Sequence, residues 1–321
     1  MTRQQTTASR VRAILRTQFP PRWGPRYIAA QLSTRAQAPR SSKPSDSYSD
    51  KLQRRLHFMS TGETGLGPLA LMHPGLFELK TQVALCPKPQ DHPLVGHPFA
   101  RLLTLPTTSG TAQAAERLGL LSQHPKTREK LKDGSSQWIP VPLVHDLLLF
   151  LKDEQGPYCV LWDVKRHRGD HGKPWQGDWA ESTDRKAIRH AEALDAIFVE
   201  HMRELAIRIV RLARDDLDPM LAINLRRLYE VHAQPIHLAP QVHAEALDAF
   251  VEALKTGTPP NVVIDLFVQA GVDASQVKLV LDQAIWQRRI RIDLYSWWST
   301  DQPLLPEVRD PLVENAEWFA R

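Results

Sequence analysis

Two strongly apolar segments that follow one another closely constrain the fold of this chain most. Residues 142–151 (PLVHDLLLFL) and 158–165 (YCVLWDVK) are rich in Leu, Val and aromatic residues, a composition typical of buried strands. The residues between them, Asp153 to Gly156, are typical of a turn. The sequence therefore predicts an antiparallel hairpin over these two segments.

This hairpin carries two acids and a lysine inside otherwise apolar strands. A turn at 153–156 places Asp146 directly opposite Asp163, with Cβ atoms about 4.5–5.5 Å apart. Two carboxylates at such a short distance repel each other unless a cation or a proton lies between them. The period of two along a strand puts Lys165 on the same face as Asp163. Because Mg²⁺ uses one or two carboxylates and keeps several waters, we expect a magnesium site here.

Such a site has the groups needed to cleave a phosphodiester. A bound metal ion would polarise the phosphate and lower the pKa of the attacking water. Lys165 would position or deprotonate that water, or stabilise the developing charge. The loop after it (RHRGDHGK) is basic, so we expect Arg166, Arg168 and Lys173 to contact DNA. The alternative is a surface ion pair, because Asp-x-Lys is a common pattern on strands.

The other segments up to residue 218 predict an α/β domain. We expect strands at 76–85 and 205–213, helices at 50–59 and 182–203, and a Gly-rich loop at 60–70. Residues 87–137 are polar and Pro-rich, with room for two short helices, and suggest an insertion at about 90–137. The predicted nuclease domain spans 46–218.

A second, helical domain is predicted over residues 219–300. Helices are expected at 220–231, 243–254, 261–270 and 275–286, with a helix-turn-helix formed by the last two and a strand-like wing at 290–294. The basic cluster with Arg288 and Arg289 is a candidate DNA contact, and docking to a protein is an equal alternative. The tail at 301–321 is expected to be extended. Its Trp318 and Phe319 suggest docking on a partner or back on this chain.

Positive charge is concentrated at the start of the chain. Residues 1–58 hold twelve Lys or Arg and two acids, whereas the net charge of the whole chain is +5. We expect residues 1–45 to be a basic arm that either contacts nucleic acid or is partly disordered. The two cysteines, Cys86 and Cys159, exclude a disulfide scaffold and a Cys-based zinc site and favour a reducing compartment. No apolar run is long enough for a membrane span.

Asp146, followed by Asp163–Val164–Lys165, resembles the PD-(D/E)XK nuclease signature. Further segments resemble the TnsA-type endonucleases, the endonuclease subunits of heteromeric bacterial transposases. These segments are residues 47–50, 77–82, 207–213, 224–228 and 284–293. The resemblance covers about residues 46–305, and the order and spacing of the motifs support it.

The resemblance implies a restriction-endonuclease-like domain plus a winged-helix domain, in a bacterial cytoplasmic protein. Such subunits cut the 5′ ends of transposon DNA beside a DDE transposase, contact an AAA+ regulator ATPase, and need Mg²⁺ or Mn²⁺. The resemblance also implies that Asp146 is the central metal ligand, with Asp163 and the Val164 carbonyl as further ligands. Lys165 is then the catalytic lysine, and the helix glutamate of the family falls at Asp50.

Two alternatives stay open at this point. The first is a non-catalytic adaptor that binds DNA or a partner on a degenerate nuclease fold. It is favoured by an aspartate, Asp50, where the family has a glutamate. The second is a nuclease of repair or restriction rather than of transposition. Binding of Mg²⁺ or Mn²⁺ at Asp146 and Asp163 distinguishes the adaptor from the two enzymes.

Overall fold

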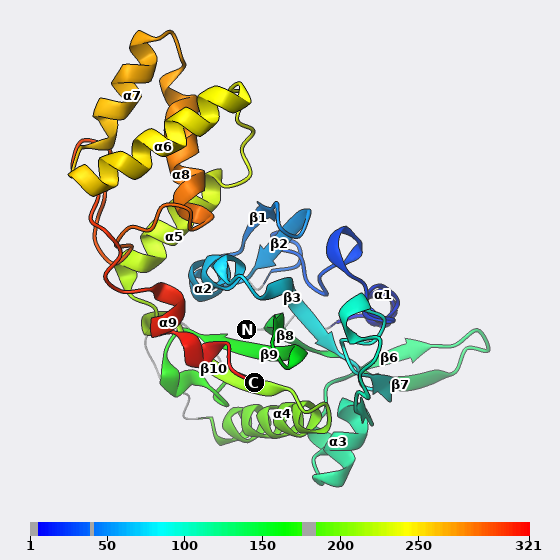
Figure 1. The fold of residues 1–321 in the computed structure, drawn as a ribbon. Coiled ribbons are helices and arrows are strands. Elements are labelled where there is room, and N and C mark those ends of the chain that lie inside the picture. The colour runs from blue at the N-terminus through cyan, green and yellow to red at the C-terminus, as the bar shows by residue number, and fades with distance from the viewer. Residues whose placement is uncertain (1–5, 39–41, 175–183) are drawn as a thin grey trace.

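A four-stranded mixed sheet lies at the centre of the computed structural model, which describes residues 6–38, 42–174 and 184–321 (Figure 1). Its strand order is β10-β9-β8-β3. The antiparallel strands are β3 (Leu76–Leu85), β8 (Leu143–Asp153) and β9 (Gly156–Lys165), and β10 (Arg208–Ala213) runs parallel to β9. A parallel pair needs a long crossover, and helix α4 (Arg185–Glu204) provides it.

The central hairpin has the register that the sequence predicts. Leu147 faces Trp162, and Asp153 faces Gly156 at the turn. Gly156 has a φ of +109°, a conformation that L side chains rarely adopt, which explains the glycine at this position. The predicted strands at 76–85, 142–151, 158–165 and 205–213 are therefore confirmed, with shifts of a few residues at their ends.

Both faces of the sheet are covered, which is why its strands are almost continuously apolar. Leu149 and Trp162 point into a core shared with α2 (Thr61–Met72) and α5 (Pro219–Val231). Leu148 and Leu161 point the other way, into a core with α4. All four side chains are at least 98% buried. Burial of each such side chain contributes roughly 1.5–3 kcal/mol to folding.

Residues 45–72 differ from the expectation. The segment predicted as a helix at 50–59 is the second half of an antiparallel pair, β1 (Ser45–Ser49) and β2 (Arg54–Phe58). The segment predicted as a loop at 60–70 is helix α2. Two of its glycines permit close packing: a Cβ on Gly67 would lie 2.7 Å from the Phe58 ring, and one on Gly62 would lie 3.0 Å from Val164.

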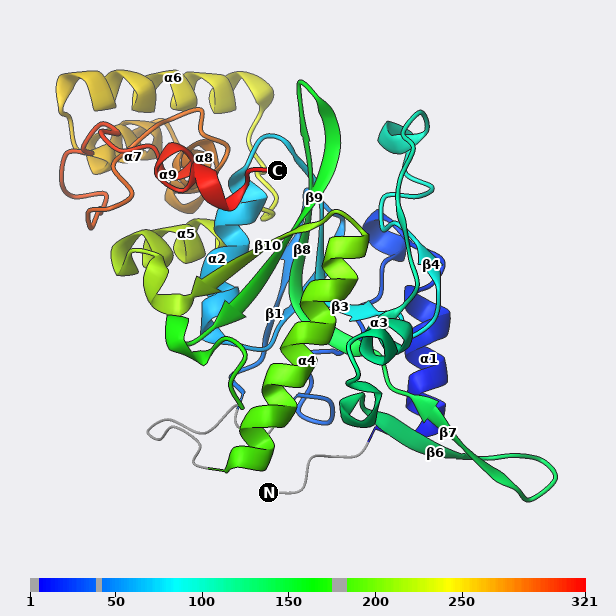
Figure 2. The same ribbon diagram turned by 90° about the horizontal axis from the view of Figure 1, so that it is seen from below.

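The predicted insertion contains more regular structure than expected. It holds the strand pair β4 (Gln90–Asp91) and β5 (Thr107–Thr108), then α3 (Thr111–Arg117), then β6 (Lys126–Lys130). Strand β6 pairs with β7 (Ser136–Pro140), which begins inside the predicted insertion and ends just beyond its limit. Figure 2 shows that β6 and β7 form a ribbon that projects away from the sheet.

The basic N-terminal arm is largely folded within the residues that the structure describes. It forms α1 (Ala8–Gln18) and a 3₁₀ turn, η1 (Gly24–Arg26), and it lies along β3. The backbone amide of Ala30 donates to the Gln82 carbonyl at 3.0 Å, and the Tyr27 hydroxyl donates to the Thr81 carbonyl at 2.8 Å. The expectation of partial disorder therefore does not hold for residues 6–38. The rest of that expectation, over residues 1–5 and 39–41, lies outside the described residues.

The four helices predicted in the second half are confirmed as α5, α6 (Pro240–Thr256), α7 (Pro260–Gln269) and α8 (Ala274–Trp286). Asp273 caps α8 by accepting from the amides of Ser275 and Gln276. The expected wing is not a strand pair, because Ile292 makes only an isolated bridge to Pro306. None of the helices in the described residues is both long and apolar enough to cross a membrane.

The C-terminal tail folds back on the sheet instead of extending. It forms α9 (Pro311–Glu314) and a 3₁₀ turn, η6 (Ala316–Trp318), near β9 and β10 (Figure 1). The Trp162 indole donates to the Trp318 carbonyl at 2.7 Å, and the Tyr158 hydroxyl donates to the Phe319 carbonyl at 2.9 Å. Of the two alternatives for these aromatics, docking back on this chain is confirmed.

Candidate active site

Lys165 brings the two predicted aspartates together at one end of the central sheet. Its Nζ lies 2.5 Å from Asp163 Oδ1 and 3.7 Å from Asp146 Oδ2. The Asp163 side chain is 4% exposed, that of Asp146 20% and that of Lys165 34%. The ammonium is therefore reachable from solvent while one carboxylate is fully enclosed. This convergence is the geometry that the alternation along β8 and β9 predicts.

The two aspartates are not direct partners in the ladder, in contrast to the expectation. The paired register of β8 and β9 ends at Leu147 and Trp162. One residue further, Asp146 Oδ2 accepts a hydrogen bond from the backbone amide of Val164 at 2.8 Å. A carboxylate thus takes a backbone donor at the point where the ladder ends. Val164 contributes its amide to the cluster, and the role of its carbonyl as a metal ligand stays a prediction.

Glu63 is a third acid of this cluster, and the sequence analysis missed it. It is 2% exposed and accepts from the Met59 amide, the Ser60 hydroxyl and the Gln82 side chain at 2.9–3.0 Å. Burial and the nearby charge of Asp146 raise the pKa of Glu63 to about 8. The pattern Ser60-x-x-Glu63 before an apolar run is the sequence signature of a capping box, and the Ser60 side chain does accept from the Glu63 amide, so this helix start can be recognised from the sequence.

Asp50 does not belong to the cluster. It is exposed in the turn between β1 and β2, where its carboxylate accepts from the Gln53 side chain at 2.9 Å. Its amide donates to His232 Nε2 at 3.2 Å. The premise that Asp50 opens a helix is wrong, because the helix in front of the sheet is α2. Glu63, on the first turn of that helix, is the acid that shares the site.

The charges of the cluster shift one another. Burial raises the pKa of Asp146. Burial also acts to raise the pKa of Asp163, but the His171 hydrogen bond and the Lys165 charge outweigh it and hold this pKa well below its usual range. Burial acts to lower the pKa of Lys165, and Asp146 and Asp163 outweigh it, so this pKa is raised. Lys165 is therefore a permanent cation near neutral pH, better suited to stabilise charge than to accept a proton.

His171 is a second residue that the sequence analysis did not assign to the site. Its Nδ1 lies 2.9 Å from Asp163 Oδ2, and its side chain is 6% exposed. The basic composition of this loop predicts that His171 meets phosphate or solvent rather than metal, whereas its ring holds the Asp163 carboxylate in place. The buried Nε2 of His171 has no hydrogen-bond partner within the described residues.

His145, next to Asp146, has a structural role. Its ring stacks on Phe198 of α4, with centroids 3.7 Å apart. Burial lowers the pKa of His145 to about 3, so the ring is neutral at physiological pH. A neutral, stacked imidazole fixes the end of β8 against α4 and thereby the backbone that carries Asp146.

The donor set fits a hard divalent cation. Carboxylate oxygens are the ligands that Mg²⁺ and Mn²⁺ prefer. Burial is the main cause of the raised pKa values of Glu63 and Asp146, and a divalent cation beside them would favour their ionised forms. Across the described residues, no three His, Cys, Asp or Glu side chains are grouped as metal ligands. Asp146 and Asp163 would therefore hold such an ion together with water, substrate oxygens and the predicted Val164 carbonyl.

The predicted DNA contacts fall into two groups. Arg166, Arg168 and Lys173 are exposed in the loop that follows Lys165, and Arg168 pairs with Asp216 at 2.6 Å. The other group follows α8 and is distant from the acids in the sequence. There Arg289 is exposed, whereas Arg288 pairs with Asp310 at 2.6 Å and Glu307 at 3.5 Å. Acids compensate the charge of Arg288, which weakens the case for a phosphate contact by this residue.

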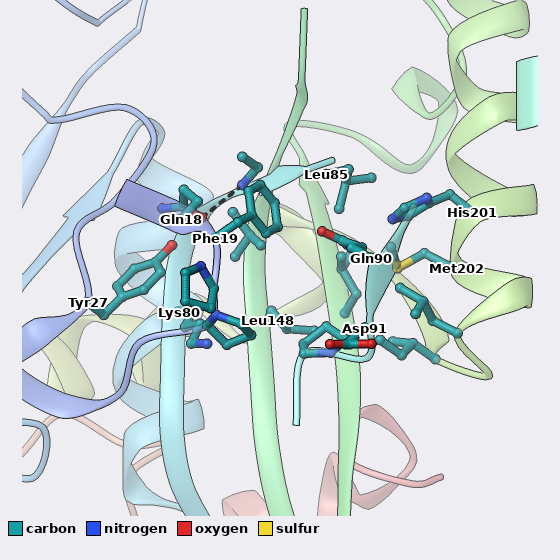
Figure 3. Close-up of a pocket in the computed structure, with 18 residues that line it drawn as sticks. Gln18, Phe19, Tyr27, Lys80, Leu85, Gln90, Asp91, Leu148, His201 and Met202 are labelled. Carbon is teal, nitrogen blue, oxygen red and sulfur yellow. Dashed lines mark hydrogen bonds between the residues drawn. The ribbon is translucent and has the colours of Figure 1, made fainter. Parts of the chain in front are cut away.

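A cavity of about 180 Å³ lies apart from the acidic cluster, between the N-terminal arm, β3 and α4 (Figure 3). Its walls are largely apolar, with Leu148 and Met202 among them. Burial lowers the pKa of Lys80, which also lines the cavity, to about 8. None of the three predicted catalytic groups on β8 and β9 lines this space, so it is not the substrate site of the cluster.

Comparison of the chain with models of protein families finds no match, and comparison with curated proteins finds none either.

Proposed function

We propose that this protein is a metal-dependent DNA endonuclease of the TnsA type, a phosphodiester hydrolase that serves as a subunit of a transposase. The observation that carries the proposal is the contact of the Lys165 ammonium with both Asp146 and Asp163. Two acids from neighbouring strands and a lysine two residues after the second acid are the groups that the nuclease signature requires.

The arrangement of elements supports the same proposal. The chain runs from α2 through the three-stranded meander β3-β8-β9 and the crossover helix α4 to the parallel strand β10. This order fits a restriction-endonuclease-like domain. An acid on the helix before the meander is part of the implied pattern, and Glu63 on α2 supplies it. The aspartate that favoured a degenerate site, Asp50, is no longer the relevant residue.

The proposed chemistry divides among the residues of the cluster. A bound Mg²⁺ or Mn²⁺ would supply Lewis-acid activation of the phosphate and a water of lowered pKa. Asp146 and Asp163 would hold the ion, and His171 would orient Asp163. Lys165, which stays protonated, would stabilise negative charge on the phosphate oxygens as the bond to the leaving oxygen breaks. The exposed Arg166 and Lys173 would hold the strand.

The finer features of the proposal come from the resemblance. The substrate would be double-stranded DNA at transposon ends, cut at the 5′ strand beside a DDE transposase, in the cytoplasm of a bacterium. The helices α5–α8 would correspond to the winged-helix domain and take part in contact with an AAA+ regulator ATPase. A helix-turn-helix at α7 and α8 supports this assignment, although the wing strands are absent from the described residues.

The test is 5′-strand nicking of end-containing duplex DNA with Mg²⁺, in the presence of the transposase subunit encoded by an adjacent gene. Asp146→Ala and Lys165→Ala are each expected to abolish nicking. Asp50→Asn is the matched control, since it removes an exposed acid outside the cluster and should retain wild-type nicking. Retained cleavage by either cluster variant would refute the site.

A non-catalytic adaptor is the second candidate function. The observation that favours it is that Lys165 and His171 already engage both oxygens of Asp163. Calorimetric titration with Mn²⁺ separates the two candidates. An endonuclease should bind the ion in a manner that Asp146→Ala removes, whereas an adaptor should show no such binding.

A further inference from the structure

The ribbon formed by β6 and β7 has two chemically different faces. Residues of β6 alternate, so the odd and even positions point to opposite sides. One face carries Lys126, Arg128 and Lys130, all exposed, and across the pair Arg128 faces Trp138. Trp138 is 62% exposed, and Lys126 Nζ lies 5.5 Å from the centre of its ring. This basic face has no acid among the residues that the structure places on it.

The opposite face is the one that attaches the ribbon to the protein. Glu129 points to that side, and its carboxylate lies 3.3 Å from Arg12 of α1. The Glu129 side chain is 12% exposed, and Thr127 and Ile139 beside it are half-buried. The ribbon is therefore held with its acidic residue turned inward and its three cations turned to solvent. A random placement of charges along the ribbon would not be expected to separate the acid from the three cations in this way.

The position of the ribbon relates it to the acidic cluster. Strand β7 ends at Pro140 and β8 begins at Leu143, so the ribbon continues almost directly into the strand that carries Asp146. The six steps along the chain from Pro140 to Asp146 span at most about 22 Å. Because one turn of B-DNA is about 34 Å long, a duplex at the ribbon can also reach the cluster.

We infer that the face of Lys126, Arg128, Lys130 and Trp138 is a docking surface for double-stranded DNA. The three cations contact phosphates and Trp138 packs against the sugar-phosphate backbone. The charge of the face complements a polyanion, and a two-stranded ribbon has dimensions that fit along or within a duplex groove. The inference rests on the proposed function for the identity of the polyanion, and it adds a docking surface separate from the cleavage chemistry.

The experiment measures binding of a 30-base-pair duplex of random sequence to the full chain by fluorescence anisotropy, without divalent cations, over a range of salt concentrations. The variant Lys126→Gln, Arg128→Gln, Lys130→Gln is expected to bind about tenfold or more weakly at 0.1 M salt. The magnitude of its slope of log K against log salt concentration should be smaller than that of wild type by about 2–3, since each phosphate contact contributes about 0.9.

The matched control removes the same charge elsewhere. Arg203→Gln, Arg226→Gln and Lys255→Gln change three exposed cations on α4, α5 and α6 and should leave affinity and slope at wild-type values. Circular dichroism reports whether each variant is folded. If the triple ribbon variant is not folded, Arg128→Gln against the charge-retaining Arg128→Lys provides the same comparison.

Three results would overturn the inference: wild-type affinity in the ribbon variant, an equal loss in the control, or no duplex binding by the wild-type chain. If the ribbon variant binds duplex DNA with wild-type affinity but loses binding to poly-glutamate, the face would instead be assigned to an acidic protein. Failure of the proposed function is a different result, because it appears as nicking retained by Asp146→Ala.

Discussion

Glu63 joins helix α2 to the acidic cluster, and its ionisation links stability to pH. Its folded pKa of about 8 lies above its ordinary value of 4.5, so between these values the folded state holds a proton that the unfolded state has lost. Without metal, stability should therefore fall as pH rises from 4.5 to 8.

Glu63→Gln, which cannot ionise, should remove this dependence. We expect the difference in unfolding free energy between variant and wild type to change by about 2–4 kcal/mol over that range, because one pKa unit is about 1.4 kcal/mol. Urea unfolding at pH 5 and pH 8 in EDTA measures it. If the unfolding free energies of the two proteins change equally between pH 5 and pH 8, the assignment of the raised pKa to Glu63 is contradicted. In the nicking assay with Mg²⁺, the variant should be at least tenfold slower than wild type.

His201 makes the protein sensitive to acid. It is fully buried on α4, and burial lowers its pKa to about 4 from an ordinary value of 6.5. Below pH 6.5 the unfolded state binds a proton that the folded state does not, so stability should decrease as pH falls from 6.5 to 4. His201→Gln should reduce that loss by roughly 1–3 kcal/mol in thermal unfolding. If the variant loses as much stability as wild type between pH 6.5 and pH 4, groups other than His201 cause that loss.

The site could be predicted from sequence only where alternation fixes side-chain direction. Asp146, Asp163 and Lys165 lie on strands whose register follows from one turn, and the structure brings them together. Glu63 was missed because the glycines around it are typical of a loop, and the contacts that require those glycines come from β2 and β9. His171 lies in a loop, where no periodicity indicates what a side chain faces.

At the level of elements, helix α2 shows how context decides the role of a glycine. Gly67 lies against Phe58, and an added Cβ would be 2.7 Å from the ring, whereas a Cβ on Gly65 would meet only ordinary contacts at 3.7–3.8 Å. We expect Gly67→Ala to destabilise the protein by about 1–3 kcal/mol. Gly65→Ala in the same helix should stabilise it by about 0.5–1 kcal/mol. Chemical denaturation of both variants gives the comparison, and equal effects would contradict it.

Elements with one dominant periodicity were predictable, and those whose pairing is set by distant contacts were not. The α5–α8 helices have apolar stripes of helical spacing, and all four are present. The ribbon β6–β7 is mostly polar, with Trp138 exposed on one face and Ile139 half-buried on the other, so its sequence lacks the alternation of a buried strand. Leu56 of β2 and the flanking Leu52 and Met59 also fit a helical spacing, which predicts a helix from the sequence, whereas pairing with β1 makes this segment a strand.

At the level of the whole molecule, the C-terminal return packs against the sheet. Phe319 is 3% exposed, stacks on His73 with centroids 4.5 Å apart, and lies 5.2 Å from the Trp162 ring. Phe319→Ala should destabilise the protein by about 3–5 kcal/mol, the usual cost of removing a buried aromatic ring. Val313→Ala, at a side chain that is 70% exposed, should change stability by less than about 0.5 kcal/mol. A small effect of Phe319→Ala on the melting temperature would show that the return contributes little.

The return of the tail also determines how the two halves of the protein separate. The chain leaves the sheet after β10, forms α5–α8, and comes back to β8 and β9, where Arg321 binds Asp153 at the hairpin turn. A single proteolytic cut between α5 and α6 would therefore not release the helical half, because non-covalent contacts tether it at both ends. Force applied across such a nicked molecule would have to detach the tail from the sheet before the fragments could part.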